Sequence, residues 1–404
     1  MSSTAKGRLP LAPLLALAMA AFVTILTEAL PAGLLPQMAD GLAVSEAWVG
    51  QTVTLYALGS LLAAILLTIA TQGIARRPLL LAAIAGFAIA NTITTLSSSY
   101  ALTMVVRFLA GVSAGLLWAL LAGYAARMVP EHQKGSAIAI AMVGTPLALS
   151  LGVPAGAFLG SLVSWRVCFG IMSVLAVILM LWVRLQVPDF AGQAQGKQQR
   201  LAHVLRLPGI RPVLLVVLAF VLAHNILYTY IASFLAEAGM AQRTDLVLLV
   251  FGGASLIGIW IVGVLIDRHL RALTLTSTLL FCAAALALGL AGTSPTIVYI
   301  AVGVWGLAFG GSATLFQTAL AKSAGDEADV AQSMLVTAWN TAIASGGLLG
   351  GVLLDQLGVG AFPPALLVLL AATLMVTWMA KRHGFAASND ESDVSRPATV
   401  GRQA

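Results

Sequence analysis

Two ionisable residues lie inside long apolar stretches of this sequence, where charged side chains are rare. Glu28 belongs to the apolar run that begins at Leu11, and Arg107 to the run that begins at Tyr100. A charge at the centre of a bilayer costs about 2.5–3.5 kcal/mol on insertion scales, so such residues usually face a bundle interior and mark a path for substrate or protons. Counted along their helices, the two residues can lie at similar depth. We therefore expect Glu28 to exchange a proton and Arg107 to tune its charge.

Each of these residues also has a structural interpretation. The carboxyl of Glu28 can hydrogen-bond locally beside the helix break that Pro31 predicts. The long side chain of Arg107 can reach the outer interface, or it can fix helix packing without touching a substrate.

A second group of polar residues lies in similar apolar stretches. An isolated polar side chain there most often makes an interhelical hydrogen bond, worth about 0.6 kcal/mol on average. The same side chains can line a cavity for a substrate, and the histidine among them can relay protons. The candidates for the cavity lining are Asn91, His224, Tyr228, Gln317 and Asn340.

The elements that must position these residues are membrane-spanning helices. The chain has 404 residues, of which 60% are apolar and 9% charged, and its mean hydropathy is +0.98. Soluble proteins contain about 45–50% apolar residues, so a soluble protein is excluded. Apolar stretches of about 20 residues recur between clusters of Pro, Gly, Ser and charged residues. They predict an all-α membrane protein with twelve transmembrane helices over residues 11–37, 46–71, 78–98, 100–127, 135–162, 165–187, 211–236, 244–266, 272–292, 295–321, 330–355 and 361–380.

One connection between these helices is long. The polar stretch 188–210 divides the chain into an N-terminal half of six helices, 1–187, and a C-terminal half of six helices, 211–381. The tail 382–404 has no apolar face and is expected to be disordered.

Lys and Arg are distributed unevenly between alternate loops. Eighteen lie on the side that holds both termini and the long linker, and only Arg166 and Arg243 lie on the other side. Because cationic loops resist translocation, both termini are expected in the cytoplasm. This bias explains the net charge of +6 without a nucleic-acid partner. A signal peptide cleaved near Ala20 is an alternative, but the apolar run continues to Leu35, which favours an uncleaved first helix.

Motifs of soluble enzymes and metal sites give little support for catalysis. Gly111 to Gly115 match GxSxG around Ser113 without the strand–turn–helix context of a hydrolase, and the same glycines predict a closely packed helix face. The sequence contains no GxxxxGK[ST] and no HExxH motif. Cys168 and Cys282 show no metal-ligand spacing. We expect no enzyme activity, no metal and no cofactor beyond a proton gradient; an intramembrane serine hydrolase remains the alternative of another class.

A short motif at the end of the second helix is repeated in the two halves. Residues 263–268 read GVLIDR, and residues 68–73 form a degenerate copy with other residues at the Gly, Asp and Arg positions. Here the sequence resembles the major facilitator superfamily over practically its whole length, from Leu11 to Lys381. In that family the motif and the basic residues after it form a cytoplasmic gate. The resemblance implies gating roles for Asp267, Arg268, Arg76 and Arg77.

Two further segments narrow the resemblance. Residues 107–115 are similar to the helix 4 motif of the family, whose arginine is linked to proton coupling. The fifth helix resembles the Gly/Pro-rich antiporter motif of exporters, although Val153 precedes Pro154 where that motif has Gly-Pro. Glycines let helices approach closely and proline bends a helix. The implied helix-packing residues are Gly144, Gly152, Pro154 and Gly156.

Other short motifs are similar to bacterial drug and arabinose-type efflux permeases, among them Thr27-Glu28, GLLP at 33–36 and YALG at 56–59. The resemblance implies a monomeric transporter of the bacterial inner membrane that exports a drug, sugar or nucleoside-like molecule in exchange for protons by alternating access. A proton-coupled uptake permease is the nearest alternative. A sensor that binds a ligand without transporting it is another.

Overall fold

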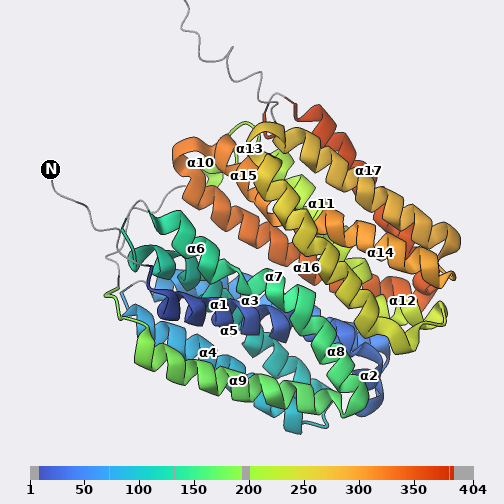
Figure 1. Ribbon diagram of the computed structural model, residues 1–404, viewed down its shortest axis with the longest axis horizontal. Helices are drawn as coiled ribbons and strands as arrows, with labels where there is room; N and C mark the ends of the chain where they lie inside the picture. The colour runs from blue at the N-terminus through green and yellow to red at the C-terminus, as the bar shows by residue number, and fades with distance from the viewer. Residues whose placement is uncertain (1–8, 72, 131–132, 193–200, 382, 386–404) are drawn as a thin grey trace, which may run out of the picture.

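The computed structural model describes residues 9–71, 73–130, 133–192, 201–381 and 383–385 (Figure 1). Most of the predicted tail 382–404 and the middle of the predicted linker lie outside this part of the chain, as do Gln72 and the side chain of Asp267. Every regular element of the described residues is a helix, so the fold is all-α.

The helices form two groups that lie side by side (Figure 1). The first group consists of α1 (Leu11–Gly33), α2 (Leu35–Leu42), α3 (Glu46–Ala70), α4 (Arg76–Leu96), α5 (Tyr100–Arg127), α6 (Lys134–Met142), α7 (Gly144–Leu147), α8 (Val153–Leu162) and α9 (Trp165–Gln186). The second consists of α11 (Ile210–Thr229), α12 (Ile231–Glu237), α13 (Thr244–Ala291), α14 (Pro295–Gly310), α15 (Ser312–Ala324), α16 (Ala328–Leu357) and α17 (Phe362–Met379). The short helix α10 (Leu201–Val204) lies at one end of the bundle and α12 at the opposite end, so we call these the α10 end and the α12 end.

Ten helical segments of the described chain are long and apolar enough to cross a bilayer. Their most apolar windows have mean hydropathies between 1.6 and 2.4, and they fall on ten of the twelve predicted ranges. Helices α3 and α16, with 25 and 30 residues, lie over the other two, 46–71 and 330–355. The chain is therefore a multi-pass helical membrane protein.

Several predicted helices are interrupted. The predicted helix 11–37 breaks at Leu34, whose φ and ψ are −120° and 13°. Pro36 then lies in the first turn of α2, the place in a helix where proline is tolerated. The predicted helix 211–236 breaks in the same way at Tyr230, with φ −110° and ψ 25°, between α11 and α12.

The predicted helices 244–266 and 272–292 are joined in the long helix α13. Its one residue with non-helical angles is His269, at φ −132° and ψ 28°. No glycine or proline lies between Asp267 and Arg271 to end the helix. The boundary between the two predicted helices is therefore a kink at one residue and not a loop.

The glycines of the fifth helical segment allow α1 to approach it closely. A Cβ atom added at Gly144 would meet backbone atoms of Ala18 and Phe22. Gly152 faces the ring of Phe22 in the same way, and Gly156 faces a side chain of α1 one turn further along. Larger side chains here would force the two helices apart, so the glycines set the distance between them.

Between these glycines the helix widens into a π-turn over Ala148–Gly152. Pro154 has no N–H to donate to the carbonyl of Ser150, and its ring crowds that carbonyl. A π-turn relieves such crowding by adding a residue to the turn. The same turn contacts the second helix group, since a Cβ at Gly252 of α13 would fall on the backbone of Ser150.

Replacing Gly144 by valine should destabilise the protein, because the new side chain would meet the backbone of α1. Overpacking of this kind costs about 1–3 kcal/mol, so we expect a lower melting temperature for the detergent-purified variant. Gly123→Val is the matched control, since a Cβ at Gly123 of α5 has no neighbour within 4 Å among the described residues. Equal melting temperatures for the two variants would show that the stability of the bundle does not depend on this close approach.

Candidate functional site

The guanidinium of Arg107 is buried between α5, α1 and α3. The side chain is 1% exposed, and its Nη1 donates to the carbonyl of Thr27 at 2.7 Å while Nη2 donates to the carbonyl of Glu28 at 3.3 Å. The carbonyl of Thr27 is available because Pro31, four residues later in α1, has no N–H to donate. The ring centroid of Tyr56 lies 4.9 Å from Cζ of Arg107. This burial excludes the interpretation in which Arg107 reaches an outer interface.

Two further helices hold the same stretch of α1. The hydroxyl of Tyr56 on α3 donates to the carbonyl of Thr24 at 3.0 Å. The amide of Asn91 on α4 donates to Oγ1 of Thr27 at 3.1 Å. Asn91 was expected in the cavity lining, but its amide makes this interhelical hydrogen bond, and Asn91 is not part of the lining of the cavity between the helix groups.

A cavity of about 110 Å³ lies between the two helix groups beside this stretch of α1. In the part of the chain that the structure describes, the Glu28 carboxylate makes no hydrogen bond or ion pair, and it faces this cavity. The guanidinium of Arg107 binds the neighbouring backbone carbonyls and not the carboxylate. The lining consists of Ile25, Glu28, Ala29, Ala32, Val53, Thr145, Leu149, His224, Asn225, Tyr228, Thr229, Phe309, Trp339 and Ile343.

An aromatic cluster around His224 forms the wall that the second helix group contributes. The imidazole stacks on Phe309, with ring centroids 3.5 Å apart and planes at 9°, and on Tyr228, at 5.0 Å and 26°. The ring of Trp305 lies 5.3 Å from the imidazole on another side. His224 is 4% exposed and Tyr228 is 5% exposed, so both rings are held in fixed positions.

Three polar atoms of the cavity lining have no hydrogen-bond partner within the described residues. They are Nδ1 of His224, the hydroxyl of Tyr228 and Oγ1 of Thr145. Two lining residues were not expected from the sequence. Thr145 lies in α7 directly before a proline, and the sequence signal for Asn225 was its place directly after His224. The amide of Asn225 donates to the carbonyl of Val221 in its own helix.

Two of the predicted cavity residues lie elsewhere. The side chain of Gln317 is exposed, and its backbone carbonyl accepts a hydrogen bond of 2.9 Å from Gln332. The amide of Asn340 donates to the carbonyl of Val336, one turn earlier in α16. Neither belongs to the lining of the cavity; on α16 it is Trp339, the residue before Asn340, that lines it.

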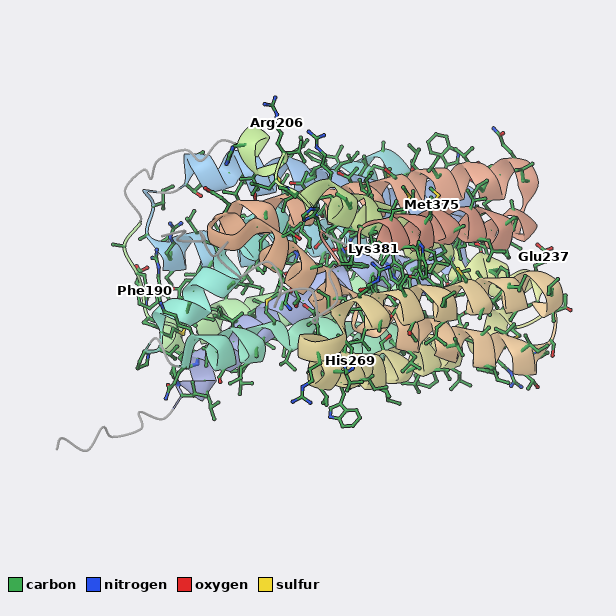
Figure 2. The ribbon with its side chains drawn as sticks, turned by 90° about the horizontal axis from the view of Figure 1, so that it is seen from above. Phe190, Arg206, Glu237, His269, Met375 and Lys381 are labelled. Atoms are coloured by element: carbon green, nitrogen blue, oxygen red, sulfur yellow. The ribbon has the colours of Figure 1, made fainter. Side chains whose placement is uncertain are left out.

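The predicted gate residues of the first half contact the chain that follows α9. The backbone N–H of Arg76 donates to the carbonyl of Phe190 at 2.8 Å, and that of Arg77 donates to the carboxylate of Asp189 at 3.0 Å. Figure 2 shows Phe190 at the opposite end of the molecule from Glu237, and therefore away from the α12 end. In the second half, Arg268 directly precedes the kink of α13.

The GxSxG match of α5 is a packing surface. A Cβ at Gly111 would meet the backbone of Tyr56 on α3. The hydroxyl of Ser113 donates to the carbonyl of Leu109 in its own helix at 3.2 Å. The helix context therefore supports close packing and not a hydrolase nucleophile.

Polar contacts join the two helix groups at the α12 end. We call Ala47, Gln51, Tyr230 and Gly347 the Tyr230 cluster. The hydroxyl of Tyr230 donates to the carbonyls of Gly347 at 2.7 Å and Ala47 at 3.3 Å. The amide of Gln51 donates to the carbonyl of Gly347 at 3.2 Å and contacts the Tyr230 hydroxyl at 3.4 Å. These contacts link α3 of the first group to α11, α12 and α16 of the second.

A second cross-group contact lies next to this cluster. The hydroxyl of Ser233 on α12 donates to the carboxylate of Glu46 at the start of α3. Together with the Tyr230 cluster, it joins the two helix groups at this end.

The protein is an all-α membrane bundle with a largely apolar cavity between two helix groups. It therefore belongs to the class of helical membrane proteins that enclose a central site. Residues 17–344 match the model of the Major Facilitator Superfamily. The chain belongs to this family. Family membership, together with the names of several relatives, indicates a transporter of small molecules and not an enzyme.

The chain is similar in sequence to curated proteins along most of its length. It is 28% identical to the purine ribonucleoside efflux pump NepI of Escherichia coli (strain K12) over 359 residues, which are 87% of this chain and 90% of that protein. It is 29% identical to the transcription regulatory protein OpdE of Pseudomonas aeruginosa over 370 residues, 90% of this chain and 92% of that protein.

Removing the Arg107 side chain should destabilise the protein, because the carbonyl of Thr27 would lose its donor. An unsatisfied buried polar group costs about 1–3 kcal/mol, so Arg107→Ala should melt at a lower temperature. In a Pro31→Ala background, residue 31 regains an N–H that can reach the Thr27 carbonyl, and the loss should shrink. The melting temperatures of the parent, both single variants and the double variant measure this coupling.

Arg243→Ala is the control for this cycle, since it removes an exposed cation at the α12 end and should change stability by less than about 0.5 kcal/mol. Strictly additive effects of Pro31→Ala and Arg107→Ala would contradict the link between the proline and the arginine.

Proposed function

We propose that this protein is a secondary transporter that exports a small, neutral or weakly cationic organic molecule in exchange for protons. The observation that carries the proposal is the Glu28 carboxylate, which faces a mostly apolar cavity between the two helix groups. A carboxylate at such a place is costly and marks a functional site. It can bind a proton while the cavity is open to one side of the membrane and release it on the other, which couples proton entry to substrate exit.

The proposed topology has twelve membrane-spanning helices, with residues 1–187 and 211–381 as the two halves and 188–210 as the linker. The excess of cationic residues on one side, eighteen against two, supports cytoplasmic termini. The bacterial relatives are consistent with a location in the bacterial inner membrane. We expect the protein to act as a monomer.

Export by alternating access requires that the contacts between the two helix groups at the α12 end break and that this end opens. With both termini in the cytoplasm, this end faces outward, and the Tyr230 cluster is the proposed outer gate. Asp267 and Arg268, with Arg76 and Arg77, are the proposed gate at the other end. Their position at the start of α4 and beside the kink of α13 supports this role.

The names of the relatives narrow the range of candidate substrates. Export of purine ribonucleosides is the function named for NepI, so a nucleoside is our first choice and a drug or sugar the alternative. Transport of inosine into everted membrane vesicles would establish export, whereas uptake into right-side-out vesicles would favour an uptake permease. Binding without flux in either preparation would indicate a sensor, a possibility raised by the regulatory name of OpdE.

Glu28→Gln should abolish export driven by an imposed pH gradient while leaving the protein folded, because an amide cannot exchange protons and costs less to bury than a charge. Inosine counterflow without a gradient should persist, since it needs binding and alternation but no proton transfer. Both rates are measured in proteoliposomes. Glu28→Asp should retain part of the gradient-driven rate.

Glu237→Gln is the matched control, because this carboxylate is exposed at the α12 end (Figure 2) and should leave both rates unchanged. Undiminished gradient-driven export by Glu28→Gln would remove Glu28 from the coupling mechanism.

Tyr230→Phe should favour opening of the α12 end, because it removes the hydroxyl that donates to Ala47 and Gly347. Loss of about 0.5–1.5 kcal/mol of hydrogen bonding would raise the open fraction roughly two- to tenfold. The readout is the rate at which a membrane-impermeant maleimide labels a cysteine introduced at the cavity residue Ala32, with both native cysteines replaced by alanine. Tyr299→Phe, outside the cluster, should label at the parental rate. A labelling rate in Tyr230→Phe equal to the parent's would count against the gate.

A further inference from the structure

Residues of both helix groups that line the central cavity carry buried polar atoms with no hydrogen-bond partner among the described residues. Oγ1 of Thr145 comes from the first group, and Nδ1 of His224 and the hydroxyl of Tyr228 come from the second. Folded proteins leave few buried polar atoms unpaired, and each such atom calls for an explanation. Three of them around one cavity point to a ligand whose own polar atoms satisfy them.

The stacking around His224 limits how it can bind. Phe309 and Tyr228 both stack on the imidazole, so a ligand can reach His224 only at the edge of its ring, where Nδ1 has no hydrogen-bond partner among the described residues. The Tyr228 hydroxyl also lies at the edge of its ring. Hydrogen bonds from ring edges lie near the ring planes, which suits a ligand with donors and acceptors along one edge.

The rest of the lining matches a flat, uncharged ring. Trp339 and Phe309 contribute aromatic surface, and half of the other lining residues are aliphatic. The described lining contains no Lys or Arg, and its one ionisable carboxyl, that of Glu28, disfavours an anion. A phosphorylated compound would therefore have no counter-ion in this cavity.

Resting on the proposed export function, we propose that His224, Tyr228 and Thr145 bind the edge of an uncharged, purine-like nitrogen heterocycle, and that the cavity rejects the phosphorylated form of the same compound. Because Thr145 and His224 belong to different helix groups, the bound ring bridges the groups. It therefore connects recognition of the substrate to the relative movement of the two halves.

The first test is binding of radiolabelled inosine to the purified full-length protein by scintillation proximity. Unlabelled inosine and its base hypoxanthine should compete, because both carry the ring edge. Ribose alone and inosine 5′-monophosphate should compete at least tenfold more weakly. Competition by ribose or by the monophosphate as strong as that by inosine would overturn the proposal.

Single-atom variants then test each contact. Tyr228→Phe and Thr145→Val each remove one hydroxyl, and each should weaken inosine binding about two- to tenfold. His224→Phe should weaken inosine binding more than either hydroxyl deletion does. His224→Asn should bind inosine more tightly than His224→Phe, because the asparagine amide can place a polar atom near the position of Nδ1. Tyr299→Phe and Thr92→Val make the same two hydroxyl deletions outside the cavity lining and should bind inosine as the parent does.

The outcomes separate this inference from the export function. If inosine fails to bind while another compound from a panel of drugs and sugars is exported, the ring-edge recognition is wrong and the transporter stands. If inosine binds with the predicted pattern and no flux occurs, the export function is wrong and the recognition stands. Unchanged binding in Tyr228→Phe and Thr145→Val overturns the inference even if the His224 variants do not fold.

Discussion

The local structure of the candidate site depends on one buried cation that replaces a missing backbone donor. Pro31 leaves the carbonyl of Thr27 without a helical partner, and Arg107 supplies the hydrogen bond from α5. In a membrane interior no water is available to satisfy that carbonyl, so the bent helix needs a protein donor. Glu28 follows Thr27 directly, and its own carbonyl binds the same guanidinium. The hydrogen bond from Arg107 to the carbonyl of Thr27 therefore has two effects. It supplies the donor that Pro31 lacks, and it fixes the turn of α1 from which the Glu28 carboxylate faces the cavity.

Close approach of helix backbones helps to hold the two helix groups together. Lipid gives no hydrophobic drive for helices to associate, so small residues and polar contacts hold them together. Gly347 lets α16 approach α3, where a Cβ would meet the side chain of Thr54. The hydroxyl of Thr54 donates to the carbonyl of Ala344 at 3.2 Å, beside the Tyr230 cluster. Such contacts are individually weak, so the proposed opening of the interface would not require any one strong bond to break.

The positions of the helices could be predicted from the sequence more fully than the site. Apolar runs bounded by polar clusters predict helices because every backbone group must be paired in lipid. The direction of a side chain is harder to predict, because a helix that is apolar all round has no polar face to orient it. The sequence therefore could not predict that Asn91 of α4 points toward α1 and bonds to Thr27. Nor could it predict that the side chain of Gln317 is exposed. Thr145 was missed because threonines in helices commonly bond to their own backbone, as Thr92 does here, and only the structure shows that this one does not.

The two polar regions between the helix groups differ in how well they are satisfied, and this difference bears on how transport can be driven. At the α12 end the Tyr230 hydroxyl has acceptors on both sides of the interface, whereas three polar atoms of the cavity-lining residues have no partner in the part of the chain that the structure describes. A ligand shifts a conformational equilibrium only by the difference between its affinities for the two states. Cavity atoms already paired within the protein would give a ligand little to bind in either state. Because they are unpaired, a ligand can gain hydrogen bonds at the place where the two helix groups meet. In the proposed transport cycle, this binding free energy offsets the loss of the Tyr230 contacts when the α12 end opens.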